Sequence, residues 1–357
     1  MNGTPPVRMG AFAPLSSPGW AGAGQQLLAG MELGVRHAND SGGVGGREIE
    51  LLVRDTAADP RRAARAVDEL AAAGVVALAG EYHSVVARAV ATRADARRVP
   101  YLCSSSVLDV LTEQPSDWVA RLSPPQSRGW RVYADHLREA GHRRIAVATQ
   151  DSAYWAAGTR ILRDCLAPHG GDVTEVDMGT HSVASACDAL AAAGVTALLL
   201  LAGHPEPALP LVSAVRGDPR LGHLLLGAPA GQPELEGWEG RPGAGIPFLR
   251  YLPEQLGPLG VRVGKELRER LRSAPSFVAF EGYDSIAVLT EALRAHGADR
   301  ARVAASWPSL AVDGTRGPIR FSRTPGSTVW QWADAPVQVA DRDPSAPDRF
   351  RVLRSGR

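Results

Sequence analysis

The segment that decides the fold is Val7-Arg8-Met9-Gly10-Ala11-Phe12-Ala13, followed by the loop Pro14-Leu15-Ser16-Ser17-Pro18-Gly19. The apolar run predicts a buried strand, and the residues after the loop show helical spacing as far as Asn39. Further strands are predicted at 48–54 and 75–79, with a helix at 63–73 between them. The first hundred residues therefore alternate strand and helix, the pattern of a parallel sheet covered on both faces.

The alternation continues along the chain and divides into two series. Strands are predicted at 100–104, 118–122, 144–149, 172–178, 197–202 and 223–227, and helices at 207–215 and 277–296. Ser123-Pro124-Pro125 separates the two series, and Pro242–Pro247 and Arg323–Thr328 are predicted as two further crossovers. We therefore expect one lobe of residues 1–122 plus about 250–324, and a second of residues 123–249 plus 325–357.

The C-terminal segment breaks the alternation. Gly317–Phe321 is predicted as a late strand, and Ser327–Val339 as a final hairpin or strand pair. Trp330 and Trp332 are two positions apart, which favours packing on a sheet over stacking on a ligand. The stretch Asp341–Arg357, rich in Pro, Asp and Arg, is expected to be a packed tail or a contact surface.

Composition limits the class of protein and of partner. The chain has 357 residues, of which 45% are hydrophobic and 22% charged, as in ordinary soluble globular proteins. Its formal net charge of +1 gives no reason to expect nucleic acid or an anionic membrane as a partner. The cysteines, Cys103, Cys165 and Cys187, form no metal-binding spacing, and the sequence leaves their pairing open.

The cellular location is also left open. Residues 1–6 lack the basic and apolar regions of a secretion signal, and no apolar stretch has the length of a membrane span. The sequence is compatible with a trimmed extracytoplasmic domain or with a cytosolic protein.

Taken together, the strand Val7–Ala13, the turn Ser41–Gly46, Asp59-Pro60 and Gly80-Glu81-Tyr82-His83-Ser84 resemble the type I periplasmic-binding-protein family. The family contains the receptors of branched-chain amino acid and amide ABC transporters and their amide-sensing relatives. The resemblance implies an α/β fold of two Rossmann-like lobes with parallel sheets, joined by three crossover strands. Ligands of open α/β sheets bind at the carboxyl ends of the strands, so a cleft between the two lobes is expected.

Within the first lobe, the resemblance points to loops after three strands. Ser84 commonly contacts the ligand in this family, and Tyr82 precedes it as in the amide sensors. A plain N-cap is the alternative for Ser84. Ser104, Ser105 and Ser106 follow the next strand and can wrap an anion, or form a solvated turn. Trp20 is predicted on a loop facing the same cleft.

Within the second lobe, Asp151 and Tyr154 follow the strand predicted at 144–149, and the family often places an aromatic residue over the ligand at Tyr154. His204 lies after the strand at 197–202, where amino-acid receptors often carry an aromatic. The acidic residue expected after the strand at 223–227 is missing, because the chain reads Ala228-Pro229-Ala230. A buried ammonium needs a partner. The four acids considered for it are Glu81, Asp151, Glu206 and Glu281.

No sequence motif predicts an enzyme, a cofactor or a metal site. Phosphate-loop, HExxH and GxSxG motifs do not occur, and the histidines are scattered. We therefore expect a non-catalytic receptor that closes on a small polar ligand, either an amino acid, an amide or a related carboxylate. Its expected partner is an ABC permease or a fused signalling domain. The receptor itself is expected to be extracytoplasmic and associated with a membrane. The alternative is a cytosolic amide or metabolite sensor that acts through a regulatory protein.

Overall fold

The computed structural model describes residues 5–235, 237–323 and 325–356. The chain divides into two compact units, one of Met1–Pro125 with Gln255–Pro336 and one of Gln126–Glu254 with Val337–Arg357. It therefore passes between the units three times. None of the helices in the described ranges is both long and apolar enough to cross a membrane. All three cysteines are free thiols.

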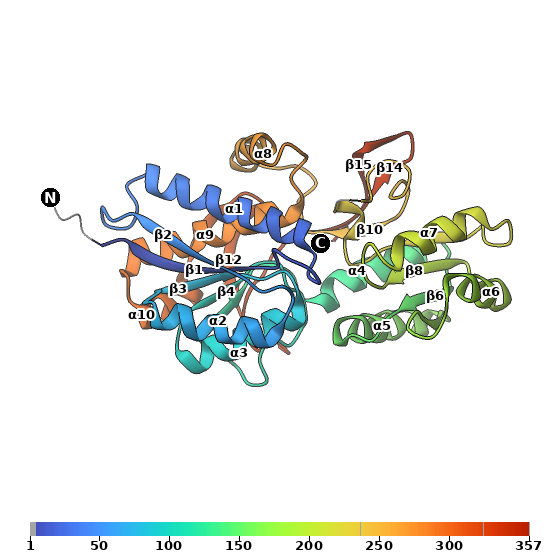
Figure 1. Cartoon of the computed structure of the whole chain (residues 1–357), viewed down its shortest axis with the longest axis horizontal. Helices are drawn as coiled ribbons and strands as arrows, with labels where there is room; N and C mark the ends of the chain where they lie inside the picture. Colours follow the sequence, from blue (N-terminus) through green and yellow to red (C-terminus); the bar gives the residue numbers. More distant parts are fainter. Residues whose placement is uncertain (1–4, 236, 324, 357) are drawn as a thin grey trace. The chain divides into compact units, whose positions relative to one another are not determined.

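The first unit is built on one sheet with the strand order β11-β12-β13-β5-β4-β3-β1-β2 (Figure 1). Its strands from β13 to β2 are parallel, whereas β11 and β12 are antiparallel additions. The bounds are β1 Val7–Ala13, β2 Ile49–Asp55, β3 Ala77–Gly80, β4 Tyr101–Cys103, β5 Val119–Arg121, β11 Ala311–Gly314, β12 Gly317–Ser322 and β13 Trp330–Trp332.

Helices cover both faces of this sheet. α2 and α3 pack on one face, and α1 and α9 lie together on the other (Figure 1). The bounds are α1 Ala21–Asp40, α2 Pro60–Ala72, α3 Ser84–Arg97, α8 Pro258–Leu271, α9 Phe277–His296, α10 Arg300–Ala305 and the short 3-10 helix η3 Trp307–Ser309.

α1 and α9 approach each other closely because glycines stand where they cross. A Cβ atom on Gly30 would lie 1.9 Å from the carbonyl oxygen of Ala279, and one on Gly282 would lie 2.2 Å from that of Leu27. Since neither distance is sterically possible, no other residue fits at these positions without moving a helix.

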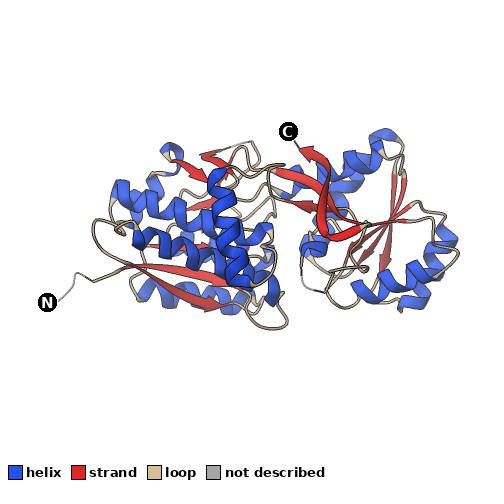
Figure 2. Ribbon diagram, turned by 90° about the horizontal axis from the view of Figure 1, so that it is seen from above, coloured by secondary structure: helices blue, strands red, loops and turns tan. Residues whose placement is uncertain are grey.

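The second unit contains a parallel sheet with the order β7-β6-β8-β9 and a smaller antiparallel sheet, β10-β14-β15. The strands are β6 Arg144–Thr149, β7 Asp172–Asp177, β8 Ala197–Leu201, β9 Leu225–Gly227, β10 Phe248–Arg250, β14 Val337–Asp343 and β15 Ala346–Gly356. The helices are α4 Gln126–Glu139, α5 Ala153–Leu166, α6 Val183–Ala193, α7 Ala208–Gly217, and the 3-10 helices η1 Ala167–His169 and η2 Gln232–Glu234. Figure 2 shows helices on both sides of the parallel strands.

The predicted α/β class with parallel sheets is confirmed, but the C-terminal prediction is wrong. Residues 330–332 do not form a hairpin with the segment after them. β13 pairs with β5 and β12 in the first unit, whereas β14 forms its hairpin with β15 in the second. Consequently residues 325–336, expected in the second lobe, belong to the first unit, and the last two crossings lie at 254/255 and 336/337.

Candidate ligand-binding site

Polar residues of the first unit gather at the carboxyl edge of its sheet, where β1, β3 and β4 end. Ser84 is the first residue of α3, and His83, not Ser84, is the N-cap. The Ser84 hydroxyl oxygen accepts hydrogen bonds from the N–H groups of Val107 and Leu108, at 3.2 and 3.4 Å. Ser84 therefore links the loop after β3 to the loop after β4, and its own O–H proton is left to donate elsewhere.

Glu81 organises the start of α3 in a way that the sequence did not reveal. It adopts a left-handed backbone conformation with φ of 67° and is fully buried. One carboxyl oxygen accepts from the N–H groups of Tyr82 and His83, at 2.9 and 2.8 Å, and the other from the Thr56 hydroxyl at 2.8 Å. The carboxyl group thus occupies two backbone N–H donors at the start of α3, which are therefore not available to a ligand. Burial raises the pKa of Glu81 to about 7.

Trp20, Tyr82 and His83 form an aromatic cluster at the same edge. The ring centroids of Trp20 lie 5.8 Å from those of both Tyr82 and His83. The backbone N–H of Trp20 donates to Nε2 of His83 at 3.1 Å, so the imidazole proton is on Nδ1. Burial lowers the pKa of His83 to about 4, which keeps the ring neutral. The structure therefore brings together Trp20 and Tyr82, which the sequence had placed on separate loops.

The three serines after β4 have different surroundings. Ser104 is fully buried, and its hydroxyl has no hydrogen-bond partner among the described residues. The Ser105 hydroxyl faces the carboxylate of Glu281, but it too is buried without a hydrogen-bond partner within the described ranges. The Ser106 hydroxyl donates to the carbonyls of Glu81 and Tyr82, both at 3.2 Å. Ser106 thus joins two loops, whereas the Ser104 hydroxyl is available to a ligand.

Behind these serines lies a buried ionic network. Arg316 donates to Glu281 at 3.1 Å and to Asp284 at 2.9 Å, and all three side chains are fully buried. The Ser123 hydroxyl lies 2.7 Å from Glu281 and 2.8 Å from the carbonyl of Ser104. Burial raises the pKa of Glu281, against the charge of Arg316. Glu81 is committed to internal partners through both carboxyl oxygens, whereas Glu281 uses Oε1 for Arg316 and Ser123, and its Oε2 has no hydrogen-bond partner among the described residues.

In the second unit the predicted residues also follow neighbouring parallel strands, β6 and β8. Asp151 is exposed. Tyr154 is half-buried at the start of α5, where its ring packs against Trp130 and Trp155 at centroid distances of 6.0 and 4.7 Å. Nδ1 of His204 accepts from the Trp238 indole at 2.7 Å, which places the imidazole proton on Nε2.

The loops after β6 and β8 are tied together at this edge. The Gly203 N–H donates to the side-chain oxygen of Gln150 at 2.7 Å, and Gln232 donates weakly to the carbonyls of Leu200 and Ala202. Glu206, on the loop after β8, is exposed. Sequence reasoning missed Gln150 and Gln232, because amide side chains within loops carry no periodic signal.

Comparison with known proteins gives the same family as the fold. Residues 6–340 match the family described as periplasmic binding protein. The chain is 32% identical over 170 residues to the chemotactic signal transduction system substrate-binding protein BasB of Halobacterium salinarum, and 28% identical over 167 residues to Leu/Ile/Val-binding protein homolog 7 of Brucella abortus. These alignments cover 45% and 44% of the chain and only 41% of each relative.

Solved structures extend the likeness over nearly the whole chain. The leucine binding protein LivK of Thermotoga maritima superposes with a TM-score of 0.84 at 21% identity, covering 98% of both chains. A solute binding protein of an R. palustris ABC transporter, in complex with benzoate, gives a TM-score of 0.80 at 19% identity and covers 98% of this chain and 96% of its own. At these identities the likeness shows the fold, and with the family match it establishes that the chain belongs to the periplasmic binding proteins.

Proposed function

We propose that the chain is a non-catalytic solute-binding receptor for a small ligand with a carboxylate or amide oxygen. The observation that carries the proposal is the Ser104 hydroxyl, which is buried at the carboxyl edge of a parallel sheet without a partner among the described residues. An unsatisfied buried hydroxyl costs about 1–3 kcal/mol, which a hydrogen-bonding ligand would recover. Ser84 supports the proposal, because its hydroxyl oxygen accepts hydrogen bonds from two N–H groups and its O–H can donate to a ligand.

The charges at this edge favour such a ligand over an α-amino acid. The buried carboxyl groups of Glu81 and Glu281 are engaged by Thr56, by backbone N–H groups and by Arg316. Asp151 and Glu206 are exposed in the other unit, where water weakens any ion pair. A ligand ammonium would therefore compete with Arg316 for the buried carboxyl group of Glu281. Carboxylates without an α-amine, and amides, fit the donors better.

The proposal includes a contribution from the second unit. Tyr154 can cover a small ligand with its ring, and His204 lies on the loop after β8 with its proton on Nε2. If one ligand contacts residues of both units, it binds best to the closed conformation and shifts the population toward it. The same scheme makes Trp20 and Tyr82 the apolar wall of the site.

The partner belongs to the proposal as well. The relatives named after Leu/Ile/Val binding favour an ABC permease, and the relative named for chemotactic signal transduction favours a signalling protein. Both functions would place the receptor outside the cytoplasm, as the family name implies.

A thermal-shift screen of the purified chain tests the proposal. The panel contains small carboxylates including benzoate, short amides, and branched-chain amino acids, and a ligand at 100 times its Kd should add about 2.7 kcal/mol of stability. We expect Ser104→Ala to lower affinity about tenfold, or about 1.4 kcal/mol. The unliganded Ser104→Ala protein should be as stable as the wild type or more so, since the substitution removes an unsatisfied hydroxyl.

Two further variants sharpen the screen. Ser84→Ala should lower affinity to a similar degree, whereas Ser213→Ala, at an exposed position on α7, should change neither affinity nor stability. If Ser104→Ala destabilises the unliganded protein and leaves affinity unchanged, the hydroxyl is structural and the proposed site is wrong. No stabilisation by any member of the panel would contradict the ligand class.

A further inference from the structure

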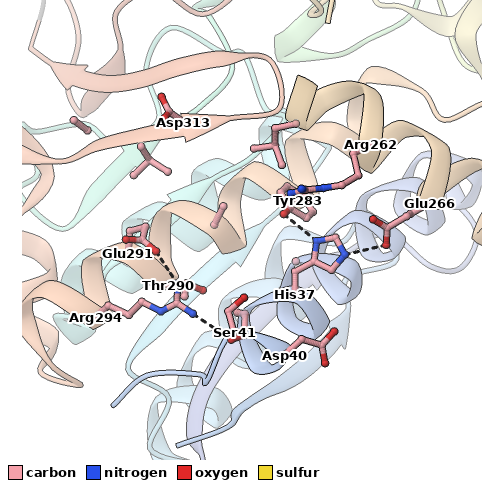
Figure 3. A pocket seen from close by; sticks show the side chains of 16 residues that line it. His37, Asp40, Ser41, Arg262, Glu266, Tyr283, Thr290, Glu291, Arg294 and Asp313 are labelled. Atoms are coloured by element: carbon pink, nitrogen blue, oxygen red, sulfur yellow. Dashed lines mark hydrogen bonds and ion pairs between the residues drawn. The ribbon is translucent and has the colours of Figure 1, made fainter. Parts of the chain in front are cut away.

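A polar pocket lies in the first unit, among α1, α8, α9 and β11 (Figure 3). Its volume of about 660 Å³ is within the range of small-molecule sites, about 300–1,000 Å³. None of the residues that line it belongs to the carboxyl-edge site described above. We refer to it as the α8 pocket.

A chain of hydrogen bonds connects three helices at one wall of the α8 pocket. Nε2 of His37 lies 2.9 Å from the carboxylate of Glu266, and Nδ1 lies 3.1 Å from the hydroxyl of Tyr283. Burial alone would raise the pKa of Glu266. Hydrogen bonds and charges from His37 and Arg36 outweigh burial and hold this pKa below its ordinary value. An ionised carboxylate only accepts, so Nε2 carries a proton, and in the neutral ring Nδ1 accepts from the Tyr283 hydroxyl.

Arg262 supplies a cation beside this chain. Arg262 extends from α8 toward the phenol of Tyr283 (Figure 3). Burial raises the pKa of Tyr283, and the charge of Arg262 opposes part of that rise. No ion pair of Arg262 is recorded among the described residues, whereas Arg294 is bound to Glu291 at 2.9 Å. A guanidinium next to a phenol is a donor set that suits a carboxylate.

The rest of the rim carries more acidic than basic residues and leaves one polar group unsatisfied. Asp40 of α1 and Asp313 of β11 line the pocket as exposed carboxylates, and Glu291 of α9 lines it as an ion pair with Arg294. Thr290 also lines it, is 3% exposed, and its hydroxyl has no hydrogen-bond partner in the described ranges. The two exposed carboxylates favour an occupant that also carries a positive charge.

We propose that the α8 pocket is a second ligand site, which binds a small zwitterion independently of the carboxyl-edge site. Arg262 and Tyr283 hold the carboxylate of this ligand. The rim carboxylates Asp40 and Asp313 stabilise its cationic nitrogen. Because both are exposed, water weakens this attraction, and the expected Kd is on the order of 1 mM.

The proton positions on His37 decide where the Tyr283 hydroxyl can donate. When both ring nitrogens carry protons, Nδ1 donates to the Tyr283 oxygen, and the phenolic O–H is free to donate to the ligand.

The test observes the ring signals of His37 in proton–carbon NMR spectra, assigned with the variant His37→Gln. The probes are glycine, β-alanine and γ-aminobutyrate, which separate their charges by increasing lengths, with acetate and methylammonium as single-charge controls. Each probe is titrated to about 10 mM, a concentration high enough to saturate a site with a Kd of about 1 mM. We expect at least one zwitterion to shift the His37 ring signals with saturation. The affinity of that zwitterion should exceed that of acetate about tenfold.

Variants distinguish the α8 pocket from the carboxyl-edge site. Arg262→Gln and Tyr283→Phe should weaken the response about tenfold, whereas Arg268→Gln, an exposed arginine on the same helix, should not. Ser104→Ala should leave the response intact, which separates this inference from the proposed function. No shift with any probe, equal affinity for acetate, or an unchanged response in Arg262→Gln would each overturn it.

Discussion

The pKa of Glu81 makes a specific prediction about stability and pH. Its carboxyl group is fully buried, and burial raises its pKa from the ordinary 4.5 to about 7. At about 1.36 kcal/mol for each pH unit, this difference corresponds to about 3 kcal/mol of the free energy of unfolding.

The sign follows from which state holds the proton. Below about pH 4.5 the Glu81 carboxyl is protonated in both the folded and the unfolded chain, and its contribution to stability is fully present. Between about pH 4.5 and pH 7 the folded protein keeps the proton while the unfolded chain loses it, so each increase in pH favours unfolding. Above that range both states are ionised, and the contribution of about 3 kcal/mol has been lost.

Urea unfolding of the wild type and of Glu81→Gln measures this loss of stability. The measurements are made at about pH 5 and about pH 8, near the lower end of the range and above its upper end. The glutamine oxygen can still accept from the Tyr82 and His83 N–H groups, and its amide can donate to Thr56. The wild type should lose about 3 kcal/mol more than the variant between the two pH values. Glu113→Gln, whose side chain is 81% exposed, is the matched control and should follow the wild type. Equal pH dependence in the wild type and Glu81→Gln would refute the reasoning.

Three further substitutions test the packing and the buried polar groups. Gly282→Ala places a methyl group 2.2 Å from the Leu27 carbonyl oxygen and should lower stability by about 1–3 kcal/mol in calorimetry; a wild-type melting temperature would contradict the close helix crossing. Arg316→Met leaves two carboxyl groups buried without their cation and should cost about 3–5 kcal/mol in urea unfolding, and a loss within the range of a surface pair, below about 1 kcal/mol, would show that the network contributes little. Ser106→Ala removes the donor to two loop carbonyls and should cost about 1 kcal/mol in the unliganded protein; unchanged stability would count against its role as a link.

Strong periodic patterns gave correct elements. The strands Val7–Ala13 and Arg144–Thr149 and the helix Phe277–His296 have the predicted bounds. Their side chains are mostly buried against neighbours, so apolar spacing reports their structure directly. β15 gave no such signal, because its residues are largely exposed and its order comes from backbone pairing with β14. A charged edge strand of this kind is indistinguishable from a polar tail in the sequence.

The candidate site was predictable by position but not by contact. Strand ends located Ser84, Ser104 and Tyr154 correctly on the carboxyl edges of their sheets. Which hydroxyls are occupied depends on partners distant in sequence, as Ser106 shows with Glu81, and this is decided only by the folded backbone. Glu81 itself was considered as a ligand for an ammonium, since its left-handed conformation cannot be read from a glutamate in a loop.

The position of β13 has a consequence for how the chain is made. Arg121, at the end of β5, donates to the Gln331 side chain 210 residues later, and β5 pairs with no other strand on that side. During synthesis the ribosome must deliver Gln126–Glu254 of the second unit, and the first unit as far as β13, before this edge can be covered. Until then the nascent first unit exposes one unpaired edge of β5 and the side chain of Arg121, which is fully buried in the folded protein. An unpaired strand edge of this kind promotes association with other chains. Completion of the first unit is therefore a late, non-local event, even though β1 is synthesised long before β13.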